Sequence, residues 1–405
     1  MYLSTARVAP VPRADGPIRR LLSGNVLALG MVSLVTDVSA EMVTAVLPAY
    51  LVLGLHFSMV QYGMVDGLYA GMTALFRLGG GYAADRWRLR KAVAGFGYGL
   101  SALARLGLLA AGPSAAGIGG ALAADRIGKG LRTPPRDALI TLSVPAPLLG
   151  RAFGVHRTMD GVGAFLGPLA ALGVLALAGS GQAFSAVFVA SFCAAALGVL
   201  LLVLFVRDRR EPVPRAERRT WSPPWRLLGA AGFRRVWLAA VLLGLVTVGD
   251  GFVYLLLQRR EDLPIMWFPL LAVGTNLAYL LLATPMGWLA DRVGRGTTVM
   301  VGCAALLSVY ALLATGGGTI PLILLLYGTF YAATDGVLMA CAGPVVPERW
   351  RTSGMAVVQT GQALAYLVSS TAFGTVWQVW GASAACWAAA CGAALALPLC
   401  GRWLR

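Results

Sequence analysis

Long apolar runs recur along the whole chain, and each has the length of a membrane-crossing helix. The hydrocarbon core of a bilayer is about 30 Å thick, which a helix of about 20 apolar residues spans. Short charged or Pro- and Gly-rich joints separate these runs. Only 12% of the 405 residues are charged, against about 25% in soluble domains. The sequence therefore predicts an all-α integral membrane protein.

Twelve such spans account for nearly all of the chain. The longest polar stretch, from Arg207 to Arg219, is too short for a soluble domain and is interpreted as a linker. The apolar runs predict spans at 24–54, 60–84, 92–112, 116–135, 152–178, 183–206, 234–257, 265–289, 297–315, 320–345, 353–377 and 380–400.

The arginines mark the two sides of the membrane. The net charge of +16 would suit a nucleic-acid partner if it formed one patch, but the arginines gather at alternate joints. The opposite joints carry only Arg259 and Arg260, which Glu261 and Asp262 offset. The positive-inside rule then places both termini in the cytoplasm. We expect a multi-pass, monomeric protein of the plasma membrane, surrounded by lipid and without a nucleic-acid partner.

A repeat divides the chain into two halves. The sequence of residues 81–86, Gly-Tyr-Ala-Ala-Asp-Arg, returns at residues 287–292 as Gly-Trp-Leu-Ala-Asp-Arg, at the exits of the second and eighth spans. Repeated halves with a cavity between them are typical of secondary transporters. We predict a six-helix half at 1–206, a basic cytoplasmic linker at 207–231, and a second six-helix half at 232–405.

The repeated segments resemble the signature of the major facilitator superfamily, which lies between spans 2 and 3 and again between spans 8 and 9. The second copy is close to complete, whereas the first has Arg88 in place of a Gly and Leu89 in place of a basic residue. In span 4, residues 126–130 (Arg-Ile-Gly-Lys-Gly) are similar to the Arg-x-x-Gln-Gly pattern of the family. In span 5, the segment from Gly163 to Pro168 resembles the Gly-x-x-x-Gly-Pro element of proton-driven exporters.

The resemblance implies a transporter of two pseudo-symmetric halves, with a latch that closes the cytoplasmic side. The alternative for the latch is a solvated turn that merely obeys the positive-inside rule. Close helix packing, in turn, explains the span 5 motif as well as a role in antiport does. The candidate latch residues are Gly81, Asp85, Arg86, Gly287, Asp291, Arg292 and Arg295, and those of the packing motif are Gly163, Gly167 and Pro168.

Ionisable residues within the spans are the candidates for proton coupling, because an unpaired charge at mid-bilayer costs at least about 2.5 kcal/mol. Asp37 lies 13 residues into span 1, at a depth similar to that of Arg126 in span 4. Glu41 follows four positions later and shares its helix face. We expect Asp37, then Glu41, to carry the proton, with Arg126 as the charge partner. The alternative is a permanent structural ion pair.

A second pair of intramembrane charges is expected to be structural. Asp66 and Arg105 lie at similar depths in spans 2 and 3, about 9–10 Å from the outer face. We therefore predict an ion pair between them.

The candidate cavity wall combines one cation with acids and amides: Lys129, Asp250, Asn276, Asp335, Gln359 and Gln362. Tyrosines such as Tyr254, Tyr279, Tyr331 and Tyr366 would complete a wall that orients a substrate, although aromatic residues in membrane helices also serve as packing and interface anchors.

The favoured function is proton-coupled export of a small organic compound. An alternative is transport of an anionic metabolite, in either direction, bound by the cations of span 4. A membrane enzyme would need a nucleophile with a base or a metal cluster, and neither His56 nor His156 is predicted to have a suitable companion. A sensor would need a signalling domain. The six cysteines lie singly, so we expect no metal and no cofactor.

Overall fold

The computed structural model describes residues 24–87, 89–145, 148–178, 183–208, 224–342, 345–346 and 351–404. Its main helices are α2 (Gly24–Ala49, continued by the π-helix η1, Tyr50–Gly54), α3 (Met59–Trp87), α4 (Arg90–Ala111), α5 (Ala115–Thr141), α6 (Leu149–Leu177), α7 (Ala183–Phe205), α8 (Ala231–Val246), α9 (Asp250–Arg260), α10 (Phe268–Val293), α11 (Arg295–Thr315), α12 (Ile320–Ala342), α13 (Arg351–Trp380) and α14 (Ala382–Trp403).

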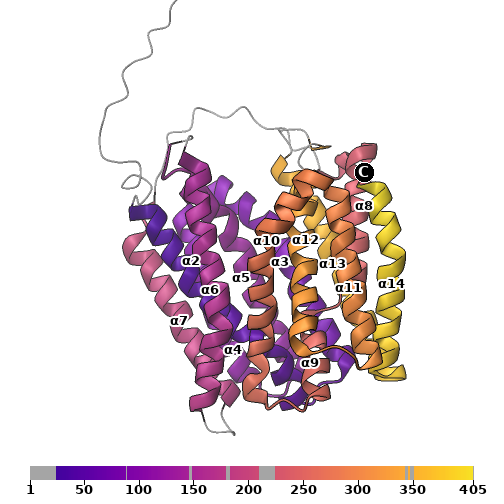
Figure 1. The fold of residues 1–405 in the computed structure, drawn as a ribbon. Coiled ribbons are helices and arrows are strands. Elements are labelled where there is room, and N and C mark those ends of the chain that lie inside the picture. Colours follow the sequence, from indigo (N-terminus) through magenta and orange to yellow (C-terminus); the bar gives the residue numbers. More distant parts are fainter. Residues whose placement is uncertain are drawn as a thin grey trace, which may run out of the picture.

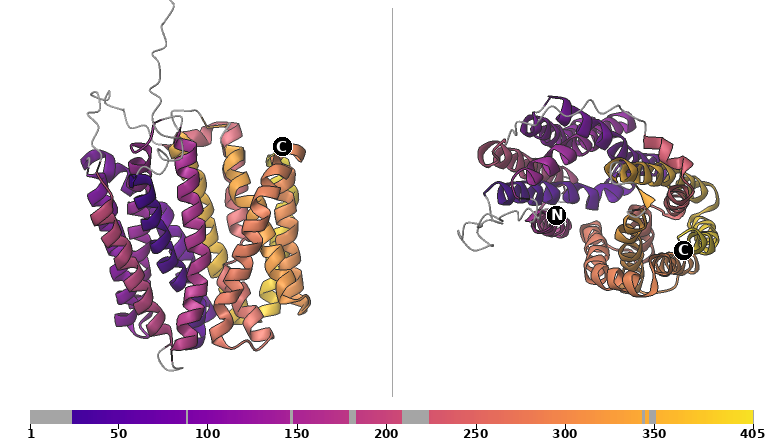
Figure 2. Two further views of the ribbon diagram at one scale, coloured as in Figure 1. Left: turned by 60° about the vertical axis from the view of Figure 1, so that its left-hand side comes forward. Right: turned by 90° about the horizontal axis from the view of Figure 1, so that it is seen from above.

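The helices form two groups that lie side by side, α2–α7 and α8–α14 (Figures 1 and 2). Counting α8 and α9 as one broken span, twelve spans run up and down, as the sequence predicts. The first and last helix ends and the ends that flank the linker lie on one side, here called the terminal face. Among the described residues, nine spans are long and apolar enough to cross a membrane. The charges of α5 keep it out of that number.

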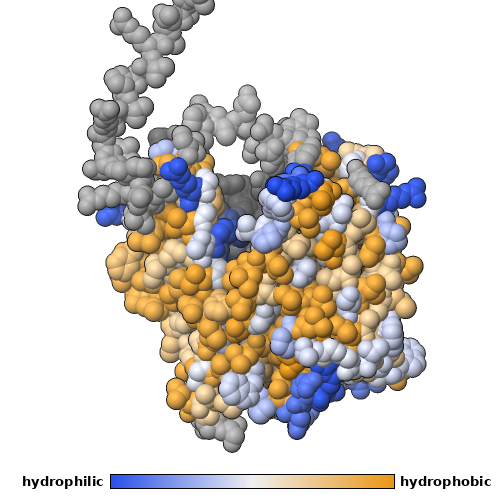
Figure 3. All heavy atoms as spheres, in the orientation of Figure 1, coloured by the Kyte–Doolittle hydropathy of each residue, from blue (hydrophilic) through white to orange (hydrophobic). Residues whose placement is uncertain are grey.

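The outer surface of the bundle is apolar where lipid would surround it. Hydrophobic residues cover the middle of the face shown in Figure 3, and hydrophilic residues gather toward its two ends. Three leucines, a valine and a phenylalanine with highly exposed side chains lie along the end of α7: Leu197, Leu200, Val203, Leu204 and Phe205. A soluble protein rarely exposes such a surface, whereas lipid chains cover it at no hydrophobic penalty.

Glycines set the closest helix crossings. A methyl group at Gly163 or Gly167 of α6 would collide with the backbone of α2. Between the halves, Gly63 and Gly67 of α3 lie directly against the backbone of α13 at Ser370 and Leu367. Small residues allow such close approach in membranes. The second crossing closes the molecule toward the face opposite the termini.

The seventh span is interrupted, which the hydropathy of its predicted range, 234–257, does not reveal. Helix α8 ends at Val246, and α9 begins at Asp250 after a short extended segment. The Tyr310 hydroxyl donates to the carbonyl of Val246 and accepts from the N–H of Val248, both at 2.9 Å. Non-helical backbone survives at membrane depth only where protein groups satisfy it in this way. The break places Asp250 at the start of a half-helix.

Candidate functional site

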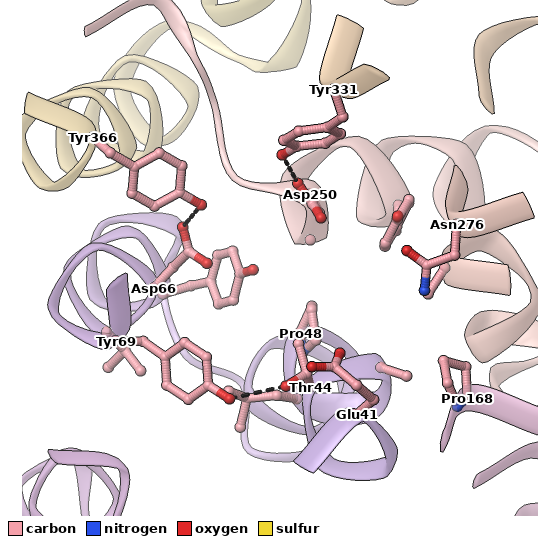
Figure 4. A pocket seen from close by; sticks show the side chains of 17 residues that line it. Glu41, Thr44, Pro48, Asp66, Tyr69, Pro168, Asp250, Asn276, Tyr331 and Tyr366 are labelled. Atoms are coloured by element: carbon pink, nitrogen blue, oxygen red, sulfur yellow. Dashed lines mark hydrogen bonds between the residues drawn. The ribbon is translucent and has the colours of Figure 1, made fainter. Parts of the chain in front are cut away.

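A cavity of about 280 Å³ lies between the two halves. Helices α2, α3 and α6 supply one side of its wall, and α9, α10, α12 and α13 the other (Figure 4). Its acidic lining residues are Glu41, Asp66 and Asp250, and its tyrosines are Tyr62, Tyr69, Tyr254, Tyr331 and Tyr366. Asn276 adds an amide. Convergent polar groups in a largely apolar cavity are typical of a small-molecule site.

Two tyrosine hydroxyls of α12 hold Asp250. Tyr331 donates a hydrogen bond to its carboxylate, and the Tyr327 hydroxyl lies 2.9 Å from the same oxygen. Tyr327 is also 2.9 Å from the Val248 carbonyl, so its single proton serves one acceptor at a time. The carboxylate sits in the first turn of α9, where the helix dipole favours negative charge.

Asp66 reaches across the boundary between the halves. Its carboxylate accepts hydrogen bonds from the Tyr366 hydroxyl at 2.8 Å and the Ser370 hydroxyl at 2.7 Å, both on α13. It also lies against Gly249 at the break in the seventh span, where any side chain would collide with it. The prediction of an ion pair between Asp66 and Arg105 is therefore wrong. The two residues match in depth, but they point in different directions around their helix axes.

Arg105 instead belongs to an ion-pair cluster inside the first half, formed by Asp37, Arg105, Asp125, Arg126 and Arg132. Asp125 pairs with Arg105 of α4 and, at 2.5 Å, with Arg126. The guanidinium of Arg132 lies 3.6 Å from the carboxylate of Asp37. Each carboxylate of this cluster thus has a cation beside it.

Two of these guanidinium groups also stack on tyrosine rings. Arg126 lies 3.6 Å above the ring of Tyr69, and Arg132 lies 4.3 Å above that of Tyr98. Tyr69 in turn lines the cavity. The cluster therefore forms the support behind the cavity wall.

The predicted proton carriers occupy different surroundings. Glu41 lines the cavity and has no ion pair with any cation that the structure describes. Asp37, one turn nearer the terminal face, has Arg132 as its neighbour, and Arg126, the predicted partner, is paired with Asp125. The depth of a residue along a helix, which residue counting gives, does not determine which way its side chain points.

Of the predicted cavity residues, Asp250 and Asn276 line this cavity. Four others lie outside its wall and nearer the terminal face along their helices: Lys129, Asp335, Gln359 and Gln362. Asp335 is exposed, and the Gln359 amide lies 3.8 Å from the sulfur of Met339. The residues of the packing motif have two different surroundings. Gly163 and Gly167 contact α2, whereas Pro168 lines the cavity.

The second copy of the repeated motif covers the end of α10 and the turn into α11. Gly294 has a φ of 95°, a conformation that favours glycine. Gly287 and the exposed Asp291 precede it, and the Arg295 guanidinium donates to the carbonyl of Ala340 on α12 at 2.7 Å.

Arg292 stacks on the ring of Trp288, with 3.8 Å to its centre. In the first copy, Gly81, Asp85 and Arg86 fall in the last turns of α3, and their side chains lie outside the described part of the structure. The role of either copy as a latch stays a prediction.

His156 does have an acidic companion, contrary to expectation. Its ring lies 3.6 Å from the carboxylate of Asp160, one turn further along α6. Both ring nitrogens lack a hydrogen-bond partner among the described residues.

Comparison with known proteins identifies the fold and the family. The sequence profile of the Major Facilitator Superfamily matches residues 29–275, more than half of the chain. The chain belongs to the Major Facilitator Superfamily. An uncharacterized MFS-type transporter of Methanocaldococcus jannaschii is 28% identical over 377 residues, which cover 89% of this chain and 90% of that protein. This protein is therefore a multi-pass membrane transporter of the superfamily and not an enzyme.

Solved structures of superfamily transporters share the fold at low sequence identity. A variant of the nucleoside transporter NupG is 14% identical with a TM-score of 0.78, over 94% of this chain and all of that one. A bacterial homolog of the human lysosomal transporter Spinster, in an inward-facing and unoccupied conformation, is 15% identical with a TM-score of 0.77. That match covers 96% of this chain and 98% of the homolog. The cargoes named for such structures are diverse and do not indicate one class of substrate.

Sequence reasoning missed two parts of the site. Asp66 was assigned to the wrong partner, although Gly63 and Gly67, four positions apart on the same helix, are a pair of small residues that indicates a close crossing. The break before Asp250 left a weaker signal in Thr247, Val248 and Gly249, of which two are β-branched and one is glycine, all poor helix formers.

Proposed function

We propose that this transporter exports a small organic compound in exchange for protons, by alternating access of the cavity to the two sides of the membrane. The observation that carries the proposal is the position of Glu41, a carboxylate in the cavity wall without an ion pair to the described residues. An intramembrane carboxylate that faces a cavity is the usual place for a proton to be loaded and released. Glu41 thereby takes precedence over Asp37 as the proton carrier.

The exporter-like motif supports the coupling because it lies against the carboxylates. A side chain at Gly167 would collide with Glu41, and the Cβ of one at Gly163 would lie 3.2 Å from that of Asp37. Any movement of α6 against α2 would therefore alter the surroundings of both acids. We infer that protonation and helix movement are linked at this contact.

The sidedness follows from the positive-inside rule, with the terminal face in the cytoplasm and the protein in the plasma membrane. Two arginines, Arg259 and Arg260, lie at the opposite face and so depart from the rule. Both have structural partners, and Arg259 lies 5.4 Å from the centre of the Trp377 ring. Arg260 pairs with Glu261 at 2.9 Å and donates to the carbonyls of Gly317 and Gly318. The halves would move as units about the linker at 207–231, with the motifs at Asp85 and Asp291 as the cytoplasmic latch.

Transport of an anionic metabolite has less support. The cations of α5 that would bind it already have internal partners, Asp125 beside Arg126 and Asp37 beside Arg132. Lys129 has no ion pair with the described residues, but it lies outside the cavity wall.

Transport in proteoliposomes under an imposed pH gradient tests the proposal. A panel of small organic compounds should include one that moves only when the gradient is present. Glu41→Gln should abolish gradient-driven movement, because the amide cannot carry a proton, while exchange of unlabelled for labelled substrate continues. Asp37→Asn should reduce the rate less.

The matched control is Glu261→Gln, which makes the same chemical change at an exposed loop. Its transport should equal that of the unaltered protein. Gradient-driven movement that survives Glu41→Gln would remove Glu41 from the mechanism, and movement that never responds to pH would remove proton coupling.

A further inference from the structure

We propose that the cavity recognises an organic cation with a flat, apolar or aromatic body. This inference deepens the proposed function and rests on it, since it names the class of compound exchanged for protons. Three features of the cavity carry the argument: the sign of its charge, the way in which that charge is held, and its aromatic wall.

The charged residues of the cavity wall are all acidic. Glu41 comes from α2, Asp66 from α3 and Asp250 from α9, so both halves contribute (Figure 4). No lysine, arginine or histidine is among the seventeen described residues that line it. Even if a cation outside the wall, such as Lys129 of α5, offset Glu41 fully, Asp66 and Asp250 would remain.

Neutral groups hold these two carboxylates. Asp250 accepts from the hydroxyl of Tyr331, and Asp66 accepts from those of Tyr366 and Ser370. A hydroxyl stabilises an anion by hydrogen bonding, but it brings no positive charge. In a cavity of low dielectric, the remaining negative charge attracts a cation more strongly than it would in water. The acids of the ion-pair cluster, by contrast, are already neutralised.

The aromatic wall suits the rest of such a compound. Five tyrosines line a volume of about 280 Å³, and tyrosine rings attract cations over their faces by about 0.5–2 kcal/mol. One face of the Tyr69 ring already makes such a contact with the Arg126 guanidinium, which lies 3.6 Å from its centre. A flat cation between such rings would place its charge near Asp66 or Asp250.

Binding to the purified full-length protein, followed by calorimetry without any gradient, tests the inference. The probes share one shape and differ in charge: N-methyl-4-phenylpyridinium, uncharged 4-phenylpyridine at alkaline pH, and biphenyl-4-carboxylate. The cation should bind at least about tenfold more tightly than the other two. This comparison uses the unaltered protein and does not depend on the folding of any variant.

Two substitutions locate the site. Asp250→Asn and Asp66→Asn should each weaken binding of the cation about tenfold and leave binding of 4-phenylpyridine unchanged. The matched control is Asp262→Asn, at an exposed position on the opposite face, which should alter neither. Equal or tighter binding of the uncharged or anionic probe, or no measurable binding of the cation, would overturn the inference.

The binding and transport measurements separate the two proposals. A protein that binds the cation but does not exchange it for protons would overturn the coupling and leave the substrate class standing. A protein that moves an uncharged or anionic compound under a pH gradient, and does not bind the cation, would overturn the substrate class and leave the proton coupling standing.

Discussion

The two halves of the transporter stabilise buried polar groups by different chemistry. In the first half, the carboxylates of Asp37 and Asp125 lie beside guanidinium groups in the ion-pair cluster. In the second half, tyrosine hydroxyls form hydrogen bonds with the carboxylate of Asp250 and with the non-helical backbone of the seventh span. Charge paired with charge leaves neither of these carboxylates without a cation beside it. Charge paired with phenol leaves an anion that is available to a proton or a cation.

The ion pairs of the first half therefore contribute mainly to stability, whereas the carboxylates at the boundary between the halves are available for exchange. Removing one member of a buried ion pair leaves an uncompensated charge, whereas removing a neutral hydroxyl leaves at most an unsatisfied polar group. Substitutions in the two regions should therefore differ in size and in what they affect.

The largest loss of stability is expected from Asp125→Ala. This change leaves both Arg105 and Arg126 buried without a carboxylate, which should lower the free energy of unfolding by about 3–5 kcal/mol. Unfolding in mixed micelles titrated with a denaturing detergent measures it. The control is Glu261→Ala, which breaks the ion pair with Arg260 at a site where the carboxylate side chain is 44% exposed. That change should cost less than about 1 kcal/mol, and equal losses would refute the contrast.

A smaller loss is expected from Tyr310→Phe. Its hydroxyl satisfies two backbone groups at the break in the seventh span, and leaving them unpaired should cost about 2 kcal/mol in the same unfolding assay. Tyr98→Phe is the matched control in the first half. Tyr98 is equally buried, but its hydroxyl has no hydrogen-bond partner among the described residues, and its ring alone supports Arg132. Similar effects of the two changes would show that phenol hydroxyls do not hold the break.

The features that the sequence predicted correctly are local properties of the chain. Hydropathy and the repeat predicted the twelve spans in two halves, because apolar length and charge at the joints are local properties of the chain. Glu41, Asp250 and Asn276 were predicted for the site because a polar residue deep in a span needs a cavity or a partner.

The partners of these residues could not be predicted, because they depend on helix rotation and on distant segments. Asp37 matches Arg126 in depth, yet Arg132 faces it. Asp66 finds its partners 300 and 304 residues away, on α13. The break at Val248 is likewise satisfied by tyrosines of α11 and α12. The sequence of the seventh span by itself does not indicate these hydrogen-bond partners.

The smallest effect is expected where Asp66 joins the two halves. Tyr366→Phe combined with Ser370→Ala removes both hydroxyl donors and should weaken closure of the opposite face. Hydrogen bonds between membrane helices contribute about 0.6–1.7 kcal/mol, so a net loss of about 1 kcal/mol would raise the ratio of open to closed molecules roughly fivefold. Stability of either half should hardly change.

Distances between spin labels at introduced cysteines measure this ratio. Position 116 lies on the opposite face of the first half and position 319 on that of the second, and both are exposed. In a background without native cysteines, the double variant should gain a population with a longer distance between the labels. Ser369→Ala is the control, because Ser369 is buried on the same helix but its hydroxyl makes no hydrogen bond within the described structure. An unchanged distribution in the double variant would mean that the glycine contacts of α3 and α13 close this face by themselves, and that Asp66 serves the cavity alone.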